Sequence, residues 1–307
     1  MDKPVVIGLV GPTAGGKTAL SLSLAAHHPI EIVCMDSMQV YRGMDIGTAK
    51  PTAAEQARIP HHMLDVADPA QPYSVAEYRE GALVAIQGIL DRGHMPVLVG
   101  GTGLYLRALS QGLTLGNTPR DDEVRGRYEE MLEVGGKQAL HDHLCRVDPV
   151  SADRLHINDT RRVIRALEVW AVTGEPFSAQ RVPEGEEPYR FLLYAPEWPR
   201  EALYQRIDSR VDQMMAQGLL DEVGSLLRRG LTADMQSMQG LGYKELVPCL
   251  TEQADIGEAL ALIKRRTRNY AKRQLTWFRP DRRIRWLAPE GMEEALPQQV
   301  RLDMEEK

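Results

Sequence analysis

The sequence of 307 residues has few cysteines, few aromatic residues and no long hydrophobic run. No apolar stretch approaches the roughly 18 residues that a membrane helix needs, which excludes a membrane span, and the first apolar run, VVIGLV, is too short for a secretory signal. The cysteines, Cys34, Cys145 and Cys249, are too widely spaced for a disulfide framework or a zinc site, and His61-His62 has no third ligand nearby. We therefore expect a cytoplasmic protein that does not associate with membranes.

Charge is unevenly distributed along the chain. The net charge is −6, yet the segment Lys264–Arg285 holds ten Lys or Arg residues and a single acid. A concentrated basic segment on an acidic body indicates a local anionic partner. We expect many of these cations to contact phosphate, and the interleaved Tyr270, Trp277 and Phe278 to pack in the core.

Short apolar runs alternate with helical patterns in the first third of the chain. Strands are predicted at 5–10, 31–35 and 96–99, and helices at 18–26 and 74–90. Residues 119–180 have only helical patterns, with breaks at Gly135-Gly136 and Asp148-Pro149, and FLLYA then predicts another strand. This alternation predicts an α/β fold, a parallel sheet flanked by helices with an all-helical insertion. The expected parts are residues 1–118, 119–185 and 186–307.

A phosphate-binding loop follows the first predicted strand. Its residues are Gly11, Pro12, Thr13, Ala14, Gly15, Gly16, Lys17 and Thr18, which fit G-x-x-x-x-G-K-[ST] at every fixed position. Glycines let backbone N–H groups converge on phosphate oxygens at a helix N-terminus. Lys17 supplies a positive charge, and the Thr18 hydroxyl is a ligand for Mg²⁺. The chain is thus predicted to have a P-loop NTPase-like fold.

The acid expected of a nucleotide hydrolase is missing. Such enzymes carry a carboxylate on a later strand that holds Mg²⁺, whereas the strand PVLV leads into Gly-Gly-Thr-Gly at 100–103. The nearest acid at a strand end is Asp36. This pattern weakens the hydrolase interpretation and leaves Asp36 free to act as a base on an acceptor.

Five further segments accompany the loop GPTAGGKT. They are DSMQVYRGMDIGTAKP (36–51), GGTGLYLRAL (100–109), NDTRRVIRALEV (158–169), QGLGYKE (239–245) and KRRTRNYAKRQLTWFR (264–279). In this order they resemble the bacterial tRNA dimethylallyltransferases, also called tRNA isopentenyltransferases, of the IPP transferase family. The resemblance implies transfer of a dimethylallyl group from dimethylallyl diphosphate to N6 of the adenosine 3′-adjacent to the anticodon, position 37. It further implies tRNAs that read codons beginning with U, and an insertion that grips the anticodon arm.

The resemblance also assigns roles to individual residues. Asp36 is the expected general base, Lys17 and Arg210 act on the donor diphosphate, and Thr102 lies near the reacting centre. The residues expected to contact tRNA are Asp36, Ser37, Met38, Gln39, Thr102, Thr160, Arg161, Arg162, Val163 and Ile164. Mg²⁺ is the expected cofactor and a monomer the expected state.

Structural roles compete with several of these assignments. From the residues alone, Arg210 fits a surface ion pair, Thr102 a helix cap and Gln39 a turn. Three other functions compete as well: prenylation of free AMP, ADP or ATP, a kinase, and a non-catalytic RNA-binding module. Prenylation of a free nucleotide does not need the inserted helices or the basic segment. A kinase needs a second metal-binding acid, which this sequence lacks. An RNA-binding module does not need Lys17, Thr18 and Asp36 together.

Overall fold

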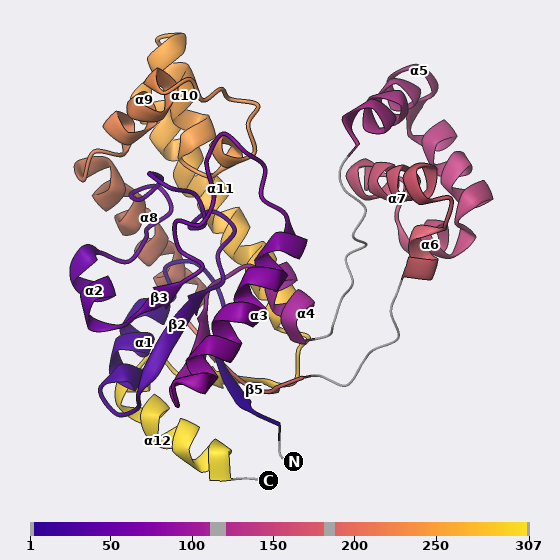
Figure 1. Cartoon of the computed structure of the whole chain (residues 1–307). Helices are drawn as coiled ribbons and strands as arrows, with labels where there is room; N and C mark the ends of the chain where they lie inside the picture. Colours follow the sequence, from indigo (N-terminus) through magenta and orange to yellow (C-terminus); the bar gives the residue numbers. More distant parts are fainter. Residues whose placement is uncertain (1–2, 111–120, 181–187, 306–307) are drawn as a thin grey trace. The chain divides into compact units, whose positions relative to one another are not determined.

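The computed structural model describes residues 3–110, 121–180 and 188–305. The chain divides into two compact units, Met1–Leu106 together with Pro188–Lys307, and Arg107–Glu187 (Figure 1). The predicted boundaries at 118–119 and 185–186 lie outside the described residues. The predicted fold class, a parallel sheet flanked by helices with a helical insertion, is confirmed.

A six-stranded parallel sheet forms the centre of the first unit. Its strands are β1 (Val5–Leu9), β2 (Ile30–Cys34), β3 (His61–His62), β4 (Met95–Val99), β5 (Arg190–Pro196) and β6 (Ile284–Leu287), in the order β3-β2-β4-β1-β5-β6. In register, Ile7 of β1 lies opposite Val97 on one side and Leu192 on the other. Strands covered on both faces are mostly apolar, which is why β1, β2, β4 and β5 could be predicted. The two edge strands β3 and β6 were not predicted because they are short: β3 is a pair of histidines, and the four residues of β6 include Arg285.

Helices cover the sheet and extend beyond its carboxyl edge. They are α1 (Lys17–Ala25), α2 (Ala53–Arg58), α3 (Val75–Asp91), α4 (Gly103–Ser110), α8 (Arg200–Ala216), α9 (Leu219–Arg228), α10 (Tyr243–Thr251), α11 (Ile256–Phe278) and α12 (Met292–Glu305), with a 3₁₀ turn at Ser237–Gln239. Helices α8 to α11 pack together (Figure 1), around a core that includes Leu219, Tyr243 and Ile263. No helix within the described ranges is long and apolar enough to cross a membrane.

The second unit is a small helical bundle with its own core. It contains α5 (Asp122–Val147), α6 (Pro149–Arg154), α7 (Thr160–Thr173) and a 3₁₀ turn at Phe177–Gln180. The predicted break at Gly135-Gly136 is confirmed, because Gly136 interrupts α5 at a φ of 71°. The predicted break at Asp148-Pro149 is confirmed as well, since Asp148 caps α6 by accepting the Ser151 N–H at 3.0 Å.

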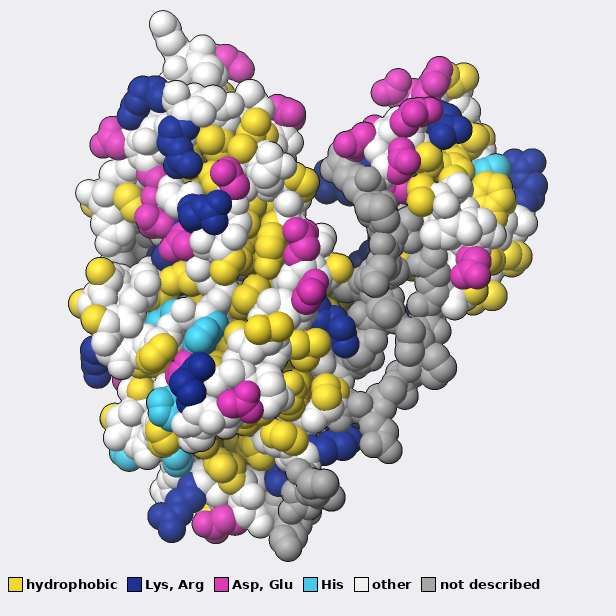
Figure 2. All heavy atoms as spheres, viewed as in Figure 1, with side chains coloured by type: hydrophobic (Ala, Val, Ile, Leu, Met, Phe, Trp, Pro, Cys, Tyr) yellow, Lys and Arg dark blue, Asp and Glu magenta, His cyan; other side chains and the backbone are white. Residues whose placement is uncertain are grey.

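A buried carboxylate fixes the edge of the sheet at β3. Glu31 of β2 is 3% exposed and accepts two hydrogen bonds from Arg92, at 2.8 and 2.7 Å. Ring nitrogens of His62 and His94 lie 2.6 and 2.9 Å from its oxygens, and Figure 2 shows histidine side chains reaching the surface beside Lys or Arg. The Arg92 hydrogen bond is the main cause that lowers the pKa of Glu31 to about 2. His62 therefore holds the edge strand to β2.

This cluster generates a prediction about stability. Glu31→Gln should lower the free energy of unfolding by about 1.5–3 kcal/mol at pH 7, because charged hydrogen bonds to a buried group are lost. The folded carboxyl has a lowered pKa, so its contribution is complete above the ordinary value of 4.5 and is lost as the pH falls toward about 2. Urea unfolding at several pH values should show the difference from wild type shrinking as the pH falls below about 4.5. Glu80→Gln, at an exposed position of α3, is the control, and equal midpoints for Glu31→Gln and wild type at pH 7 would contradict the prediction.

Candidate active site

The predicted site segments meet at the carboxyl edge of the sheet. Strands β1, β4 and β2 are neighbours, and they lead into the phosphate loop, the 100–103 turn and Asp36 respectively. Ligands of open parallel sheets bind at this edge, where the strand order reverses. Lys17, Thr18 and Asp36 line one channel of about 1170 Å³. The sheet thus joins residues that the sequence places far apart.

The phosphate loop has the backbone conformation that its glycines permit. Gly11 and Gly16 have φ values of 111° and 94°, and Gly16 directly precedes α1. The Lys17 ammonium donates to the carbonyls of Gly11 and Pro12, at 3.2 and 2.8 Å. Burial, followed by the nearby Arg210, lowers the pKa of Lys17 to about 8, while Asp36 opposes the shift. A buried ammonium beside a helix N-terminus provides a site for a polyanion.

Three side chains hold consecutive residues of this loop from outside. Gln274 accepts the Thr13 N–H at 2.9 Å, Arg206 donates to the Ala14 carbonyl at 2.8 Å, and Trp198 donates to the Gly15 carbonyl at 2.9 Å. The Arg206 guanidinium also stacks 4.2 Å above the Trp198 ring. None of the three was predicted from the sequence. The only available signal was the placement of Arg206 four residues before Arg210, on the same helix face.

The turn after β2 is joined to the turn after β4. Asp36 accepts the Met38 N–H at 2.9 Å, and the Thr102 hydroxyl accepts the Ser37 N–H at 3.1 Å. The Thr102 N–H in turn donates to the Met35 carbonyl at 3.2 Å. The Thr102 side chain therefore fixes the Asp36 turn in addition to preceding α4.

The geometry explains why a second metal-binding acid is missing here. A Cβ atom on Gly100 would lie 2.0 Å from the Met35 carbonyl oxygen, so the end of β4 has no room for a side chain. Gly101 and Gly103 are equally restricted, by Gln274 and Trp277, with closest distances of 2.0 Å. Because β2 and β4 approach so closely, no carboxylate side chain fits at these positions.

A second, smaller pocket adjoins the channel. It has a volume of about 290 Å³ and shares Asp36 and Arg210 with the channel. Ile207, Val211 and Ile263 give it an apolar wall. Burial lowers the pKa of Arg210, and the charge of Asp36 opposes this shift. Arg210 is thus a half-buried cation that lines both cavities with Asp36, which differs from the alternative of a surface ion pair.

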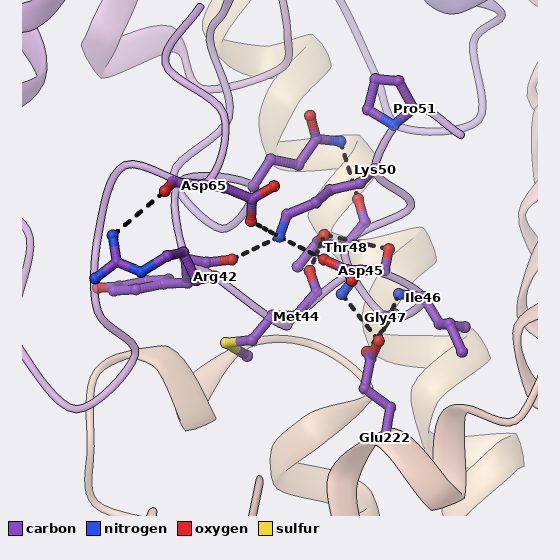
Figure 3. Close-up of polar contacts among 12 residues, drawn as sticks. Arg42, Met44, Asp45, Ile46, Gly47, Thr48, Lys50, Pro51, Asp65 and Glu222 are labelled. Atoms are coloured by element: carbon purple, nitrogen blue, oxygen red, sulfur yellow. Dashed lines mark hydrogen bonds and ion pairs between the residues drawn. The ribbon is translucent and has the colours of Figure 1, made fainter. Parts of the chain in front are cut away.

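A folded loop between Gln39 and Lys50 forms one wall of both cavities (Figure 3). The Lys50 side chain is 3% exposed; its ammonium binds Asp45 at 2.6 Å, the Tyr41 carbonyl at 2.6 Å, and Asp65. The Gln39 amide nitrogen donates to the carbonyls of Thr48 and Ala49, at 3.0 and 3.2 Å. The turn role of Gln39 is confirmed, and its predicted contact with tRNA stays a prediction.

Glu222 of α9 anchors this loop to the C-terminal helices (Figure 3). Its carboxylate accepts the N–H groups of Asp45, Ile46 and Gly47 at 2.9, 2.8 and 3.1 Å, and the Tyr243 hydroxyl at 2.6 Å. The Tyr243 ring also leaves no room for a Cβ atom at Gly47, the closest distance being 2.6 Å. The segment 239–245 therefore helps to form the smaller pocket. The sequence alone predicted no role for it.

The predicted RNA-contacting stretch of α7 is partly buried. Val163 and Ile164 are 1% and 5% exposed and belong to the core of the helical unit, so their side chains do not face a ligand. Thr160 is half-buried and Arg161 exposed, and Arg162 pairs with Asp159 at 3.2 Å. The predicted tRNA contacts are therefore limited to residues at the start of the helix, because the apolar face of α7 packs against α5.

The basic segment is half neutralised by the protein itself. Five of its ten cations form ion pairs with carboxylates: Lys264 with Asp212, Arg266 with Glu245, Arg268 with Asp208, Arg283 with Asp281 and Arg285 with Asp303. Phe278 is buried as predicted, and Trp277 packs against Gly103. Tyr270 differs from the prediction, because it lines the smaller pocket together with Asp36. Much of this segment thus binds to other helices of the first unit, including those that line the two cavities.

Comparisons with known proteins agree with this geometry. The family model for IPP transferase matches residues 39–281, and the model for isopentenyl transferase matches residues 4–68. The tRNA dimethylallyltransferase of Symbiobacterium thermophilum is 49% identical over 306 residues, covering 98% of this chain and 95% of its own length. The tRNA dimethylallyltransferase 1 of Trichlorobacter lovleyi is 48% identical over 289 residues, covering 93% of this chain and 94% of its own length.

Solved structures are also similar. The full-length tRNA isopentenylpyrophosphate transferase of Bacillus halodurans is 41% identical with a TM-score of 0.74, covering 99% of this chain and 98% of its own. A eukaryotic dimethylallyltransferase acting on tRNA is 30% identical with a TM-score of 0.79, covering 97% of this chain and 78% of its own.

The Glu222 anchor generates a prediction about loop order. Glu222→Gln replaces one acceptor oxygen by an NH₂ group that faces backbone donors, so it should lower the free energy of unfolding by about 1.5–3 kcal/mol. Hydrogen exchange of the amides at Asp45, Ile46 and Gly47 should become faster. Glu252→Gln, at an exposed position after α10, should leave exchange in this loop unchanged. Equal exchange of the three amides in Glu222→Gln and wild type would rule out the anchor.

Proposed function

Because the chain belongs to the IPP transferase family, we propose that it transfers a dimethylallyl group from dimethylallyl diphosphate to N6 of adenosine 37 in tRNA. The acceptor tRNAs are those that read codons beginning with U. The observation that carries this proposal is the shared channel: the phosphate loop and Asp36 line one cavity, which continues into an apolar pocket. A diphosphate, a short hydrocarbon and an amine acceptor need these three environments side by side.

The donor side stabilises a departing diphosphate. The C–O bond of the donor breaks, and its electron pair leaves with the diphosphate. Lys17, the first amides of α1 and Arg210 present positive charge to this group, and such preorganised charge is most effective where charge develops. The apolar wall formed by Ile207, Val211 and Ile263 excludes water from the hydrocarbon.

The acceptor side supplies a base. The N6 atom of adenine attacks the same carbon, the C–N bond forms, and the amine loses a proton. The Asp36 carboxylate takes that proton. The carboxylate is held in place by the hydrogen bond that it accepts from the Met38 N–H at 2.9 Å. Thr102 fixes the same turn through Ser37. Adenine must leave the stacked anticodon loop to enter the site, at a cost of about a few kcal/mol.

The residues present fit a Mg²⁺ ion held mainly by the donor. Within the described ranges, no group of three His, Cys, Asp or Glu residues could hold a metal by itself. The Thr18 hydroxyl is exposed to the channel beside Lys17, and Mg²⁺ commonly binds through one or two protein oxygens together with phosphates. The ion would neutralise charge on the diphosphate. Thr18 would be its ligand from the protein.

The partners follow from the two units. Arg161 and the start of α7 present positive charge from the helical unit, which supports its binding to the anticodon arm. Lys17, Asp36, Thr102 and Arg210 all belong to the first unit of the chain, which supports a monomer as the active form. A tRNA substrate and three cysteines that are all free support a cytoplasmic location.

A transfer assay tests the function directly. The protein is incubated with Mg²⁺, labelled dimethylallyl diphosphate, and either unmodified tRNA or AMP. We expect label in tRNA, at the adenosine 3′-adjacent to the anticodon. Label in AMP alone, or in neither acceptor, would overturn the proposed function.

The role of Asp36 generates a mutational prediction. Asp36→Asn keeps an acceptor for the Met38 N–H but removes the base, so turnover should fall by about 10²–10⁴-fold while donor binding changes little. Single-turnover transfer and diphosphate binding separate the two effects. Asp68→Asn is the matched control, because Asp68 accepts the Ala70 N–H in the same local pattern at 2.9 Å. A turnover within twofold of wild type would remove Asp36 from the mechanism.

The lowered pKa of Lys17 generates a prediction about pH. The free enzyme carries the ammonium below a pH of about 8 and loses it above that value. Affinity for inorganic diphosphate should therefore weaken as the pH rises through about 8, as calorimetric titration between pH 7 and 9.5 can measure. Lys17→Met should bind more weakly and show a flatter pH profile. Equal pH dependence in the two proteins would contradict the assignment.

A further inference from the structure

We propose that Gln274 is a positioning residue that sets the distance between the donor loop and the acceptor turn. The inference rests on the proposed function, because it concerns how the two substrates meet. Gln274 lies in α11, 261 residues after Thr13 in the sequence. It is 5% exposed, so the oxygen and the nitrogen of its amide need hydrogen-bond partners from the protein.

The amide bridges the two loops. Its oxygen accepts the Thr13 N–H at 2.9 Å, and its nitrogen donates to the Gly101 carbonyl at 3.0 Å. The two partners fix the orientation of the amide, because an N–H can only donate and a carbonyl can only accept. One side chain therefore ties the phosphate loop to the turn after β4.

The turn after β4 lies close against Gln274. A Cβ atom at position 101 would lie 2.0 Å from the Gln274 nitrogen and 3.2 Å from the Gly11 carbonyl oxygen. The backbone of the turn thus approaches Gln274 as closely as a glycine permits. Side chains without both a donor and an acceptor at this length cannot make the same bridge.

The contacts of Gln274 extend through Gly101 to Thr102 and the Asp36 turn. Gly101 precedes Thr102, whose hydroxyl holds the Ser37 N–H beside Asp36. One helical turn before Gln274, Tyr270 lines the smaller pocket together with Asp36. Gln274 thus contacts the donor loop directly, and it reaches the acceptor turn through Gly101 and Thr102.

This arrangement has a kinetic consequence. Transfer needs the donor carbon and the acceptor nitrogen in contact distance, and a misplacement of about 1 Å can cost about 10²-fold in rate. In this role Gln274 acts through Thr13 and Gly101, so its loss should affect turnover more than binding. A residue that served stability alone would leave turnover of the folded enzyme unchanged.

The first test removes both hydrogen bonds. Gln274→Met keeps the length of the side chain, and we expect kcat to fall by about 10- to 100-fold with KM for tRNA within about twofold of wild type. Hydrogen exchange at the Thr13 amide should become faster. Gln87→Met is the matched control, since Gln87 bonds Asp91 on the exposed side of α3 and should leave kcat unchanged.

The second test restores one hydrogen bond by protonation. In Gln274→Glu the carboxylate still accepts the Thr13 N–H but has no donor for the Gly101 carbonyl. The carboxylic acid has both, so the activity of this variant relative to wild type should rise as the pH is lowered from 8 to 5. The ratio for Gln274→Met should stay flat over the same range.

The outcomes separate this inference from the proposed function. If wild type transfers label to tRNA and Gln274→Met has a kcat within twofold of it, or if the ratio for Gln274→Glu does not depend on pH, the positioning role is overturned. If wild type transfers no label, the proposed function fails, while unchanged exchange at Thr13 in Gln274→Met would still overturn the bridge itself.

Discussion

The close approach of β2 and β4 at their carboxyl ends is the constraint on which the rest of the site depends. The Met35 carbonyl lies so near Gly100 that only a residue without a side chain fits there. This contact places the Asp36 turn against Thr102, and the neighbouring β1 brings the phosphate loop to the same edge. A carboxylate at the end of β4, as in nucleotide hydrolases, would force the strands apart. The glycine-rich turn thus has no side chain to bind a metal, and it allows a close approach between the Asp36 turn and the phosphate loop.

The second determinant of the site comes from the C-terminal helices. Arg206 and Gln274 hold the phosphate loop, and Glu222 holds the loop after β2. Each uses a charged or amide group to pair with backbone groups of these loops. The two cavities therefore have walls from both ends of the first unit, and the basic segment acts partly as their scaffold.

The sequence predicted the central strands, the phosphate loop and the helical insertion well, because each has a local signature. Buried parallel strands are continuous apolar runs, and the loop has fixed glycine spacing. The short strands β3 and β6 lack such a signature, since β3 is a pair of histidines and β6 has only four residues. Tyr270, Gln274 and Glu222 could not be predicted because their partners lie far away in the sequence. Conversely, helical periodicity alone, without the resemblance, places Val163 and Ile164 on the buried face of α7.

The separation of Thr13 and Gln274 along the chain has a consequence for biosynthesis. The phosphate loop leaves the ribosome early, but the side chain that bridges it to the Gly101 turn is made 261 residues later. The helical unit, with a core of its own, is synthesised in between. A nascent chain thus completes the helical unit before Gln274 can bridge the phosphate loop and the Gly101 turn, so the last part of the chain to be made is the part that joins the first.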